Sequence, residues 1–146
     1  MRVVVSGGGT GGHISPILAV VSQLKTLDPT VDILYIGTNA GMEAKIVQSV
    51  GLRFAGIKAG KFRRYHGARL RHVITDLSTF ALNIRDMGRV VAGFGDAVKV
   101  LRTYKPNVVF IRGGYVSVPV GLAARLLRIP YVIHESDTVI QQPLKH

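Results

Sequence analysis

The sequence predicts an α/β protein built on a Rossmann-like, doubly wound parallel sheet. Short β-branched runs alternate along the chain with longer segments in which apolar residues recur at helical spacing. A strand, a glycine turn and a helix with an early proline occur in this order twice, once near each end of the chain. Strands that alternate with helices form parallel sheets covered on both faces and joined by right-handed crossovers.

The first half of the chain is expected to contain three strands and two helices. The first helix has Pro16 in its first turn, where a missing N–H does no harm, and Gly51 is a typical residue to end the second. The predicted strands cover residues 2–6, 32–37 and 53–57, and the predicted helices cover residues 14–27 and 42–50.

The second half is expected to contain a long helical region, followed by a strand, a helix and a strand. Apolar residues from Val73 to Leu101 alternate in steps of four and three, which makes a stripe that we expect to pack on the sheet. Partial exposure of the stripe as a membrane-contact surface is the alternative. Gly88, Gly93 and Gly95 weaken the region and allow it to split into two helices. The remaining predicted elements are strands over residues 107–111 and 130–134 and a helix over residues 117–127.

The composition of the 146 residues suits one domain with a sizeable core, because 47% of them are hydrophobic and 18% are charged. The absence of cysteine excludes disulfides and thiolate metal sites. No apolar stretch reaches the roughly 18 residues of a membrane span. We expect neither a membrane span nor a signal peptide.

The net charge of +11 is concentrated mid-chain, where residues 51–100 hold ten basic and three acidic side chains. Such an excess favours an anionic partner, which is an acidic membrane surface, a phosphorylated substrate or nucleic acid. A solvated surface loop is the alternative. Nucleic acid is not expected, since only Phe62 and Tyr65 interleave with the basic residues and no recognition signature is present. The residues expected to contact an anionic membrane are Lys61, Arg63, Arg64, Arg69 and Arg71.

A glycine-rich loop follows the first predicted strand, with five glycines among residues 7–12. Gly7, Gly9 and Gly12 match the pattern G-x-G-x-x-G between a strand and a helix. Glycine lets a ligand reach main-chain N–H groups, and the helix that follows points its unpaired N–H groups at the same place. We therefore expect a phosphate or pyrophosphate there, with a tight turn that holds no ligand as the alternative.

A nicotinamide or flavin cofactor is not expected at this loop. Dinucleotide sites carry an acidic residue at the end of the second strand, and residues 35–39 contain no acid. No Gly-Lys-Ser/Thr sequence closes the turn, which excludes a P-loop. The sequence therefore predicts an anion site without a cofactor or a metal.

Three loops are expected to meet at the carboxyl edge of the sheet, where open parallel sheets bind their ligands. Thr10 is a candidate donor in the first loop. His13, at the mouth of that loop, can donate a hydrogen bond or move a proton, or it can cap the helix. The second loop is the glycine turn of residues 112–117. Glu135 and Asp137 follow the last strand, where they could bind sugar hydroxyls, act as a base or cap a helix.

Several motifs, in their order and spacing, resemble the N-terminal half of one enzyme family. They are Gly8–Ile14 with Pro16, Gly37-Thr38 with Met42-Glu43, Tyr104-Lys105-Pro106, Gly113–Ser117, and Ile129-Pro130 through His134-Glu135. The family is that of the MurG-type N-acetylglucosaminyltransferases, which are two-domain GT-B glycosyltransferases of family 28. The similarity extends over nearly the whole chain, to about Thr138.

The resemblance implies transfer of N-acetylglucosamine (GlcNAc) from UDP-GlcNAc to lipid I, which is undecaprenyl-pyrophosphoryl-MurNAc-pentapeptide. The product is lipid II for peptidoglycan synthesis, with inversion at the anomeric carbon. The resemblance also implies a peripheral protein on the cytoplasmic face of the cell membrane. In the family the N-terminal domain handles the lipid acceptor, and the C-terminal domain holds most contacts to the donor.

The resemblance also implies roles for single residues. Thr10, Gly11 and Gly12 match the loop at the cleft where donor and acceptor meet, and His13 matches a histidine proposed to contact substrate. Asp137 stands where the family has an asparagine that touches the donor, so it keeps an acceptor but adds a negative charge. Together with the analysis of the loops, this makes His13 and Glu135 the candidate catalytic residues. The candidate substrate-binding residues are Gly9, Thr10, Gly11, Gly12, Gly113, Gly114, Tyr115, Ser117 and Asp137.

We expect residues 1–138 to form a Rossmann-like acceptor-binding domain and residues 139–146 to be a C-terminal tail, with the donor domain absent. Such a half-enzyme should be weakly active or inactive alone, because the reacting groups lie between two domains. Two alternatives stay open. One is the acceptor and membrane subunit of a split glycosyltransferase, and the other is a non-catalytic module that binds a nucleotide or a phosphorylated ligand.

Overall fold

The computed structural model describes residues 1–7, 14–39, 43–58 and 77–134 and, in the last of these ranges, the side chains from Met87 onward. Apart from the long helical region, every predicted element is present with ends that differ by at most one residue. In chain order the elements are β1 (Arg2–Gly7), α1 (Ile14–Leu27), β2 (Asp32–Thr38), α2 (Glu43–Ser49), β3 (Arg53–Ile57), α3 (Leu77–Tyr104), β4 (Val108–Arg112), α4 (Ser117–Leu126) and β5 (Tyr131–Ile133).

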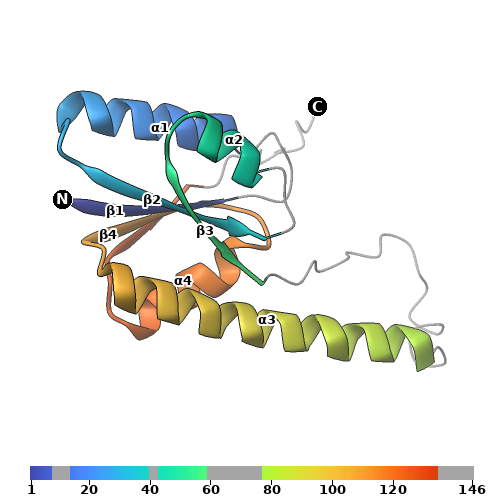
Figure 1. Ribbon diagram of the computed structural model, residues 1–146. Coiled ribbons are helices and arrows are strands. Elements are labelled where there is room, and N and C mark those ends of the chain that lie inside the picture. The colour runs from blue at the N-terminus through green and yellow to red at the C-terminus, as the bar shows by residue number, and fades with distance from the viewer. Residues whose placement is uncertain (8–13, 40–42, 59–76, 135–146) are drawn as a thin grey trace, which may run out of the picture.

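The five strands form one parallel sheet in the order β3-β2-β1-β4-β5. Helices α1 and α2 cover one face, and α3 and α4 cover the other (Figure 1). The chain builds outward from β1 to β2 and β3, then crosses back and continues from β4 to β5 on the other side. The predicted doubly wound α/β fold is confirmed.

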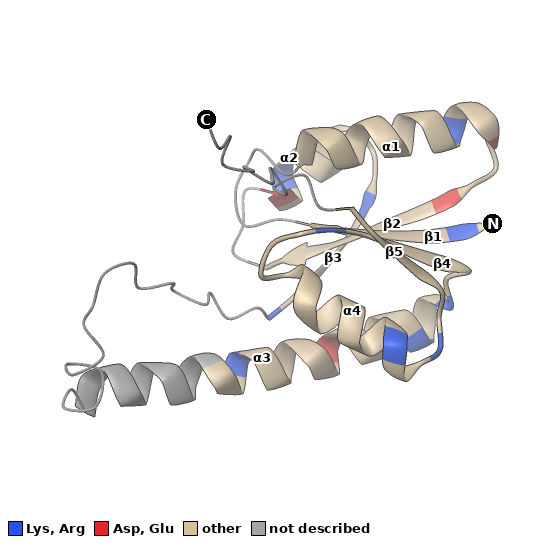
Figure 2. Ribbon diagram, turned by 180° about the vertical axis from the view of Figure 1, so that it is seen from behind, with Lys and Arg blue, Asp and Glu red and all other residues tan. Residues whose placement is uncertain are grey.

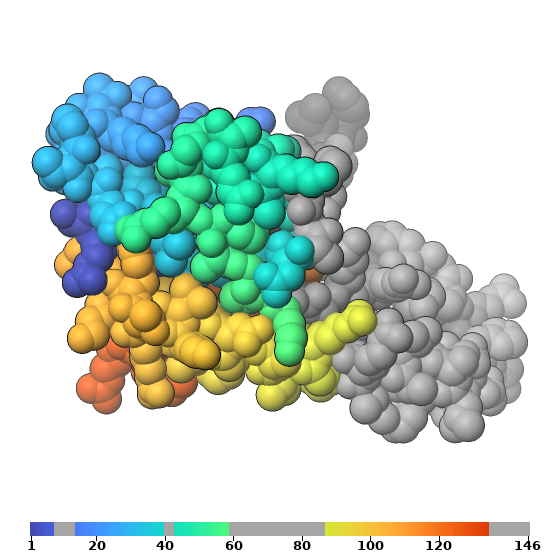
Figure 3. Space-filling view, in the orientation of Figure 1, coloured from blue at the N-terminus to red at the C-terminus, as the bar shows by residue number. Residues whose placement is uncertain are grey.

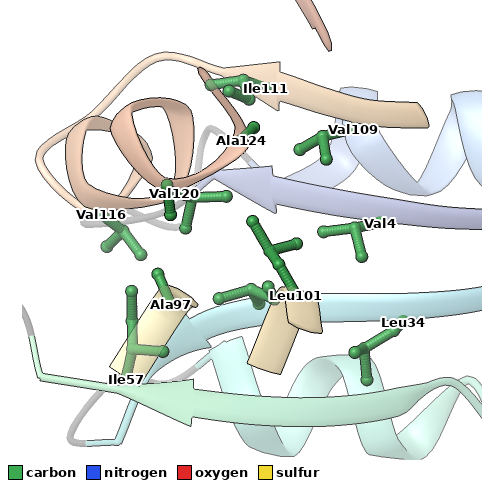
Figure 4. Close-up of a cluster of buried hydrophobic side chains, with 12 residues drawn as sticks. Val4, Leu34, Ile57, Ala97, Leu101, Val109, Ile111, Val116, Val120 and Ala124 are labelled. Atoms are coloured by element: carbon green, nitrogen blue, oxygen red, sulfur yellow. The ribbon is translucent and has the colours of Figure 1, made fainter. Parts of the chain in front are cut away.

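Strand β1 lies in the middle of the sheet and is buried on both faces, which explains its continuous β-branched sequence. Val3 and Val5 pack in one cluster with Ile17 of α1. Val4 points to the opposite face, where it packs in a second cluster with Leu101 of α3 (Figure 4). Because successive side chains of a strand point to opposite faces, β1 packs against the helices on both sides of the sheet.

Helix α3 is one continuous helix through all three of its glycines. The division into two helices that these glycines allowed does not occur. Each glycine costs a helix interior about 1 kcal/mol relative to alanine. Burial of the C-terminal half outweighs this cost, since Ala97 and Leu101 are fully buried against the sheet. Packing of an apolar face supplies most of the stability of helices in proteins.

The apolar stripe of α3 packs on the sheet only in its C-terminal half. Phe94 and Val98 pack against the buried cluster, whereas Met87 and Val91 are 56% and 64% exposed. The helix projects past the end of the sheet in this direction (Figure 1). The described part of the stripe is thus partly exposed. The side chains of residues 73–86, which form the rest of the predicted stripe, are not among those that the structure describes. No helix in the described ranges is long and apolar enough to span a membrane.

Strand β3 ends against α3. The Lys58 N–H donates to the Asp96 carboxylate at 3.2 Å, and Ile57 is fully buried in the cluster that α3 covers. The two elements adjoin on one face of the molecule, β3 in green and α3 in yellow (Figure 3). This contact fixes the end of β3 relative to the middle of α3.

A polar network closes the amino-terminal edge of the sheet. The Arg53 guanidinium pairs with the Asp32 carboxylate and lies 5.5 Å over the Tyr104 ring, whose hydroxyl donates to the Asp32 carbonyl at 2.8 Å. The hydrogen bond from Arg53 holds the pKa of Asp32 below its usual value. These side chains therefore cover the amino-terminal edge of the sheet. The glycine loops that follow β1 and β4 lie at the opposite, carboxyl-terminal edge.

Strand β5 forms one edge of the sheet and is open on both faces. Tyr131, Val132 and Ile133 are 40%, 54% and 56% exposed. Within the described part of the chain, β5 pairs with β4 alone. An apolar strand of three residues is therefore exposed along its outer side.

We expect Gly95→Ala to stabilise the protein by about 0.5–1 kcal/mol, because alanine loses less backbone freedom in a helix than glycine does. A methyl group at this exposed position would meet no atom within 4 Å. Urea denaturation followed by circular dichroism measures the change. As a control, Leu101→Ala empties a fully buried position and should cost about 2–5 kcal/mol. A less stable Gly95→Ala protein would show that α3 is irregular at this point.

Candidate functional site

The candidate site lies at the carboxyl edge of the sheet, where β1 and β4 end side by side. The chain leaves β1 toward β2 and leaves β4 toward β5, so the loops after the two strands lead in opposite directions. Open parallel sheets bind ligands at such a switch point. Gly7 pairs with Arg112 in the register of the strands, which places the start of the first glycine loop beside the start of the second glycine turn.

Gly7, the last residue of β1, is packed so closely that there is no room for a side chain. A Cβ at this position would lie 2.6 Å from Ile17 Cδ1 and 2.7 Å from the Arg112 carbonyl oxygen. The Gly7 carbonyl accepts a hydrogen bond from the buried Tyr35 hydroxyl at 2.5 Å. Close packing therefore requires glycine here independently of any ligand, and it holds the start of the first loop in place.

The second glycine turn, residues 113–116, connects β4 to α4. Gly113 and Gly114 have φ angles of +35° and +87°, which glycine adopts without strain. The Ser117 hydroxyl donates to the Gly113 carbonyl at 2.5 Å, and the Ser117 N–H donates to the Gly114 carbonyl at 3.2 Å. Ser117 is buried, so its hydroxyl holds the turn, and its contact with substrate stays a prediction.

A buried polar cluster lies behind the two glycine loops. The Thr38 hydroxyl donates to the Glu43 carboxylate at 3.2 Å, and the two residues are 6% and 4% exposed. Tyr115, from the second turn, lies next to both of them. Burial and the Glu43 charge raise the pKa of Tyr115, and a hydrogen bond with the Thr38 side chain opposes the rise. Burial and then the Glu43 charge also raise the pKa of Tyr35.

Sequence reasoning did not identify Thr38 and Glu43 as site residues. It placed Glu43 inside the second helix, without a role in binding. A signal was nevertheless present, because the pairs Gly37-Thr38 and Met42-Glu43 both belong to the motifs that resemble the glycosyltransferase family. The structure shows that this spacing brings a hydroxyl and a carboxylate together at the carboxyl edge of the sheet.

Arg112 brings a buried positive charge to the end of β4. Arginine forms strong hydrogen bonds with phosphate and carboxylate oxygens. Helix α4 begins five residues further on at Ser117, and the positive end of its dipole favours an anion at the same edge. Among the described residues no group of histidines and acidic residues could hold a metal ion. The chemistry of this edge therefore suits an anionic ligand.

Most of the predicted loop residues lie outside the described part of the chain. Their described neighbours are Gly7 and Ile14, which flank the first loop, and His134, which precedes the third. The predicted residues that the structure does describe lie in the second turn and at the start of α4, and they are Gly113, Gly114, Tyr115 and Ser117. Those outside are Gly9, Thr10, Gly11, Gly12, His13, Lys61, Arg63, Arg64, Arg69, Arg71, Glu135 and Asp137.

A second feature is an apolar groove of about 610 Å³ between α3 and α4. Leu122 and Leu126 of α4 are 50% and 58% exposed beside it. Basic residues lie at the C-terminal end of α4 (Figure 2). The groove is lined by Val90, Val91, Phe94, Leu122, Leu126, Arg125 and Arg128.

Comparison with solved structures places this fold, with its switch-point edge, in the class of the GT-B glycosyltransferases. Among solved structures, MurG of Acinetobacter baumannii is 28% identical with a TM-score of 0.66, over 92% of this chain and 33% of that chain. The glycosyltransferase SsfS6 of Streptomyces sp. SF2575 shares the fold, with a TM-score of 0.61 at 19% identity over 92% of this chain and 39% of its own.

A model of the glycosyltransferase family 28 N-terminal domain matches residues 3–141, and the chain belongs to this family. The resemblance of the motifs is thereby confirmed. Relatives from Shouchella clausii and Clostridium novyi are 40% and 41% identical over 136 residues, which is 93% of this chain and 34% of theirs. Both are named UDP-N-acetylglucosamine–N-acetylmuramyl-(pentapeptide) pyrophosphoryl-undecaprenol N-acetylglucosamine transferase. The chain spans about a third of the length of the curated relatives it matches.

We expect Gly7→Ala to destabilise the protein by about 1–3 kcal/mol, because the methyl group would overlap Ile17 and a backbone oxygen that cannot move aside. Thermal unfolding measures the loss. Gly88→Ala is the matched control, since its methyl group meets no atom within 4 Å. Equal stability of the two variants would mean that β1, β4 and α1 are less closely packed than described.

Proposed function

We propose that this chain is the acceptor-binding half of an inverting N-acetylglucosaminyltransferase of peptidoglycan synthesis. The reaction moves GlcNAc from UDP-GlcNAc to the 4-hydroxyl of the MurNAc sugar of lipid I and gives lipid II. The proposal depends on the switch point between β1 and β4, with its glycine turns, in a chain 40% identical to a relative named for this transfer.

The chemistry of the edge supports this proposal. The acceptor carries a pyrophosphate, and the donor releases UDP, so both substrates bring diphosphates. Main-chain N–H groups of the glycine turns favour such anions, and Arg112 adds a positive charge. We assign to His13 or Glu135 the removal of the proton from the acceptor hydroxyl. The hydroxyl oxygen then bonds to the anomeric carbon as the bond from that carbon to UDP breaks.

We also propose that a second domain, in cis or in trans, supplies the contacts to the donor. This chain covers 34% of the length of its relative from Shouchella clausii. Positioning of two reactants supplies a large part of the rate in such a transfer. An acceptor half without donor contacts therefore lacks most of the catalytic effect.

The chain alone is expected to transfer no GlcNAc to lipid I above background, whereas the chain joined to the C-terminal part of a relative is expected to be active. Radiolabelled UDP-GlcNAc and purified lipid I measure the transfer. In the joined protein, loss of the general base should lower kcat by about 10²–10⁴-fold, and His13→Ala and Glu135→Ala test the two candidates. Robust turnover by the chain alone would contradict the half-enzyme proposal.

We propose further that the protein attaches to the anionic cytoplasmic face of the cell membrane through α3 and α4. Three observations support this surface. The stripe of α3 is exposed at Met87 and Val91, the groove beside it is apolar, and Arg125 and Arg128 line that groove. Basic side chains beside an exposed apolar surface favour anionic lipids, with an attraction of about 1 kcal/mol for each Lys or Arg.

The double variant Arg125→Gln with Arg128→Gln is expected to bind anionic vesicles about 30-fold more weakly, because two attractive charges are lost. Sedimentation with phosphatidylglycerol vesicles measures binding, and raised salt should weaken it in the wild type. Lys25→Gln is the control, since α1 covers the opposite face of the sheet (Figure 1). Equal binding to neutral and anionic vesicles would contradict this mode of attachment.

A further inference from the structure

The Tyr35 hydroxyl lies in the interior at the carboxyl edge of the sheet, where it donates a hydrogen bond to the Gly7 carbonyl at 2.5 Å. Tyr35 is completely buried, and burial raises the pKa of its hydroxyl, so the group keeps its proton and stays a donor. The paired register of β1 and β2 ends at Ser6 and Ile36, so Gly7 lies one residue beyond it. A side chain of β2 therefore holds the carbonyl with which the first glycine loop begins.

Packing fixes the position of the Tyr35 ring. The Phe54 ring stacks beside it, with 6.0 Å between the ring centroids and 17° between the ring planes. Gly37 leaves room for this pair, since a Cβ there would lie 2.8 Å from Phe54 and 3.2 Å from Tyr35. Tyr35 also belongs to the buried cluster on the face of the sheet that α1 and α2 cover. Its hydroxyl is therefore carried by a ring that has little freedom to move away from Gly7.

The direction of the Gly7 carbonyl decides which charge the start of the loop presents. A trans peptide group is planar, and its C=O points away from the N–H of the next residue. A carbonyl oxygen repels a diphosphate, whereas an N–H attracts it. Glycine tolerates either orientation of a peptide group, so a glycine-rich sequence leaves the choice open. A buried donor on one side of the group removes that freedom, because the carbonyl is then turned into the protein.

We propose that Tyr35 is a positioning residue that turns the Gly7 carbonyl into the interior, so that the peptide group after β1 presents its N–H side to a diphosphate. The inference rests on the proposed function in so far as the ligand is a diphosphate. Tyr35 is completely buried, so it acts on the ligand through the backbone of Gly7. The second glycine turn starts beside this peptide group, because Gly7 pairs with Arg112.

Calorimetry with inorganic pyrophosphate and the full chain tests this role. Tyr35→Phe keeps the ring and removes only the hydroxyl, so the Gly7 peptide group becomes free to turn. Binding should weaken about three- to tenfold, the equivalent of one hydrogen bond. Phe54→Leu, which keeps the hydroxyl and removes the stacked ring, should weaken binding as well, and it replaces Tyr35→Phe if that variant does not fold.

Tyr104→Phe is the matched control, because it removes the same kind of hydrogen bond at the opposite edge of the sheet. There the Tyr104 hydroxyl donates to the Asp32 carbonyl at 2.8 Å. Each variant loses one hydrogen bond from a tyrosine to a strand carbonyl, so a similar loss of stability is expected in both. The control should bind pyrophosphate as the wild type does. A folded Tyr35→Phe chain that binds pyrophosphate as tightly as the wild type would overturn the inference.

A second readout does not depend on the proposed function. Carbon-13 labelling of the glycine carbonyls gives a nuclear magnetic resonance signal for Gly7, and a carbonyl signal moves when its hydrogen bond is lost. Tyr35→Phe should move the Gly7 signal, whereas Tyr104→Phe should leave it in place. If the wild type binds no pyrophosphate, the proposed anion site fails, and this signal still decides whether Tyr35 holds the Gly7 carbonyl. An unchanged signal in Tyr35→Phe overturns the inference.

Discussion

The close approach of β1, β4 and α1 at Gly7 is the constraint on which the rest of the structure depends. Among the described strands, β1 lies at the point where the strand order reverses, with β2 on one side and β4 on the other. The first glycine loop follows β1 itself and the second follows its neighbour β4, so the two loops start side by side. Ile17 and the Arg112 carbonyl leave no room for a Cβ at Gly7. The same packing that buries the core therefore sets the distance between the loops, and the position of the site follows from the fold.

The two edges of the sheet differ in how they use polar groups. At the amino edge, Arg53, Asp32 and Tyr104 satisfy one another and cover the strand ends. At the carboxyl edge the buried polar groups Glu43 and Thr38 lie behind glycine turns. Glycines at such an edge let a ligand approach the main chain closely.

Much of the fold was predictable because its signals are local or periodic. The β-branched runs of β1 and β4 and the early prolines Pro16 and Pro119 mark elements almost to the residue. The continuity of α3 was not predictable in this way. Local glycine content favours a break, and only the burial of Leu101 and its neighbours against the sheet overrides it. The glycine turns of the site were visible in the pattern, whereas the contact between Thr38 and Glu43 depends on side-chain geometry that a sequence does not display.

The exposed strand β5 has a practical consequence for the isolated domain. Its outer side offers backbone N–H and carbonyl groups, together with Tyr131, Val132 and Ile133, and it carries no charged residue. An apolar sheet edge of this kind is a template for strand addition, which natural proteins suppress with lysines, prolines or bulges. Solubility of the domain at high concentration therefore depends on covering this edge, and self-association through it would grow with concentration.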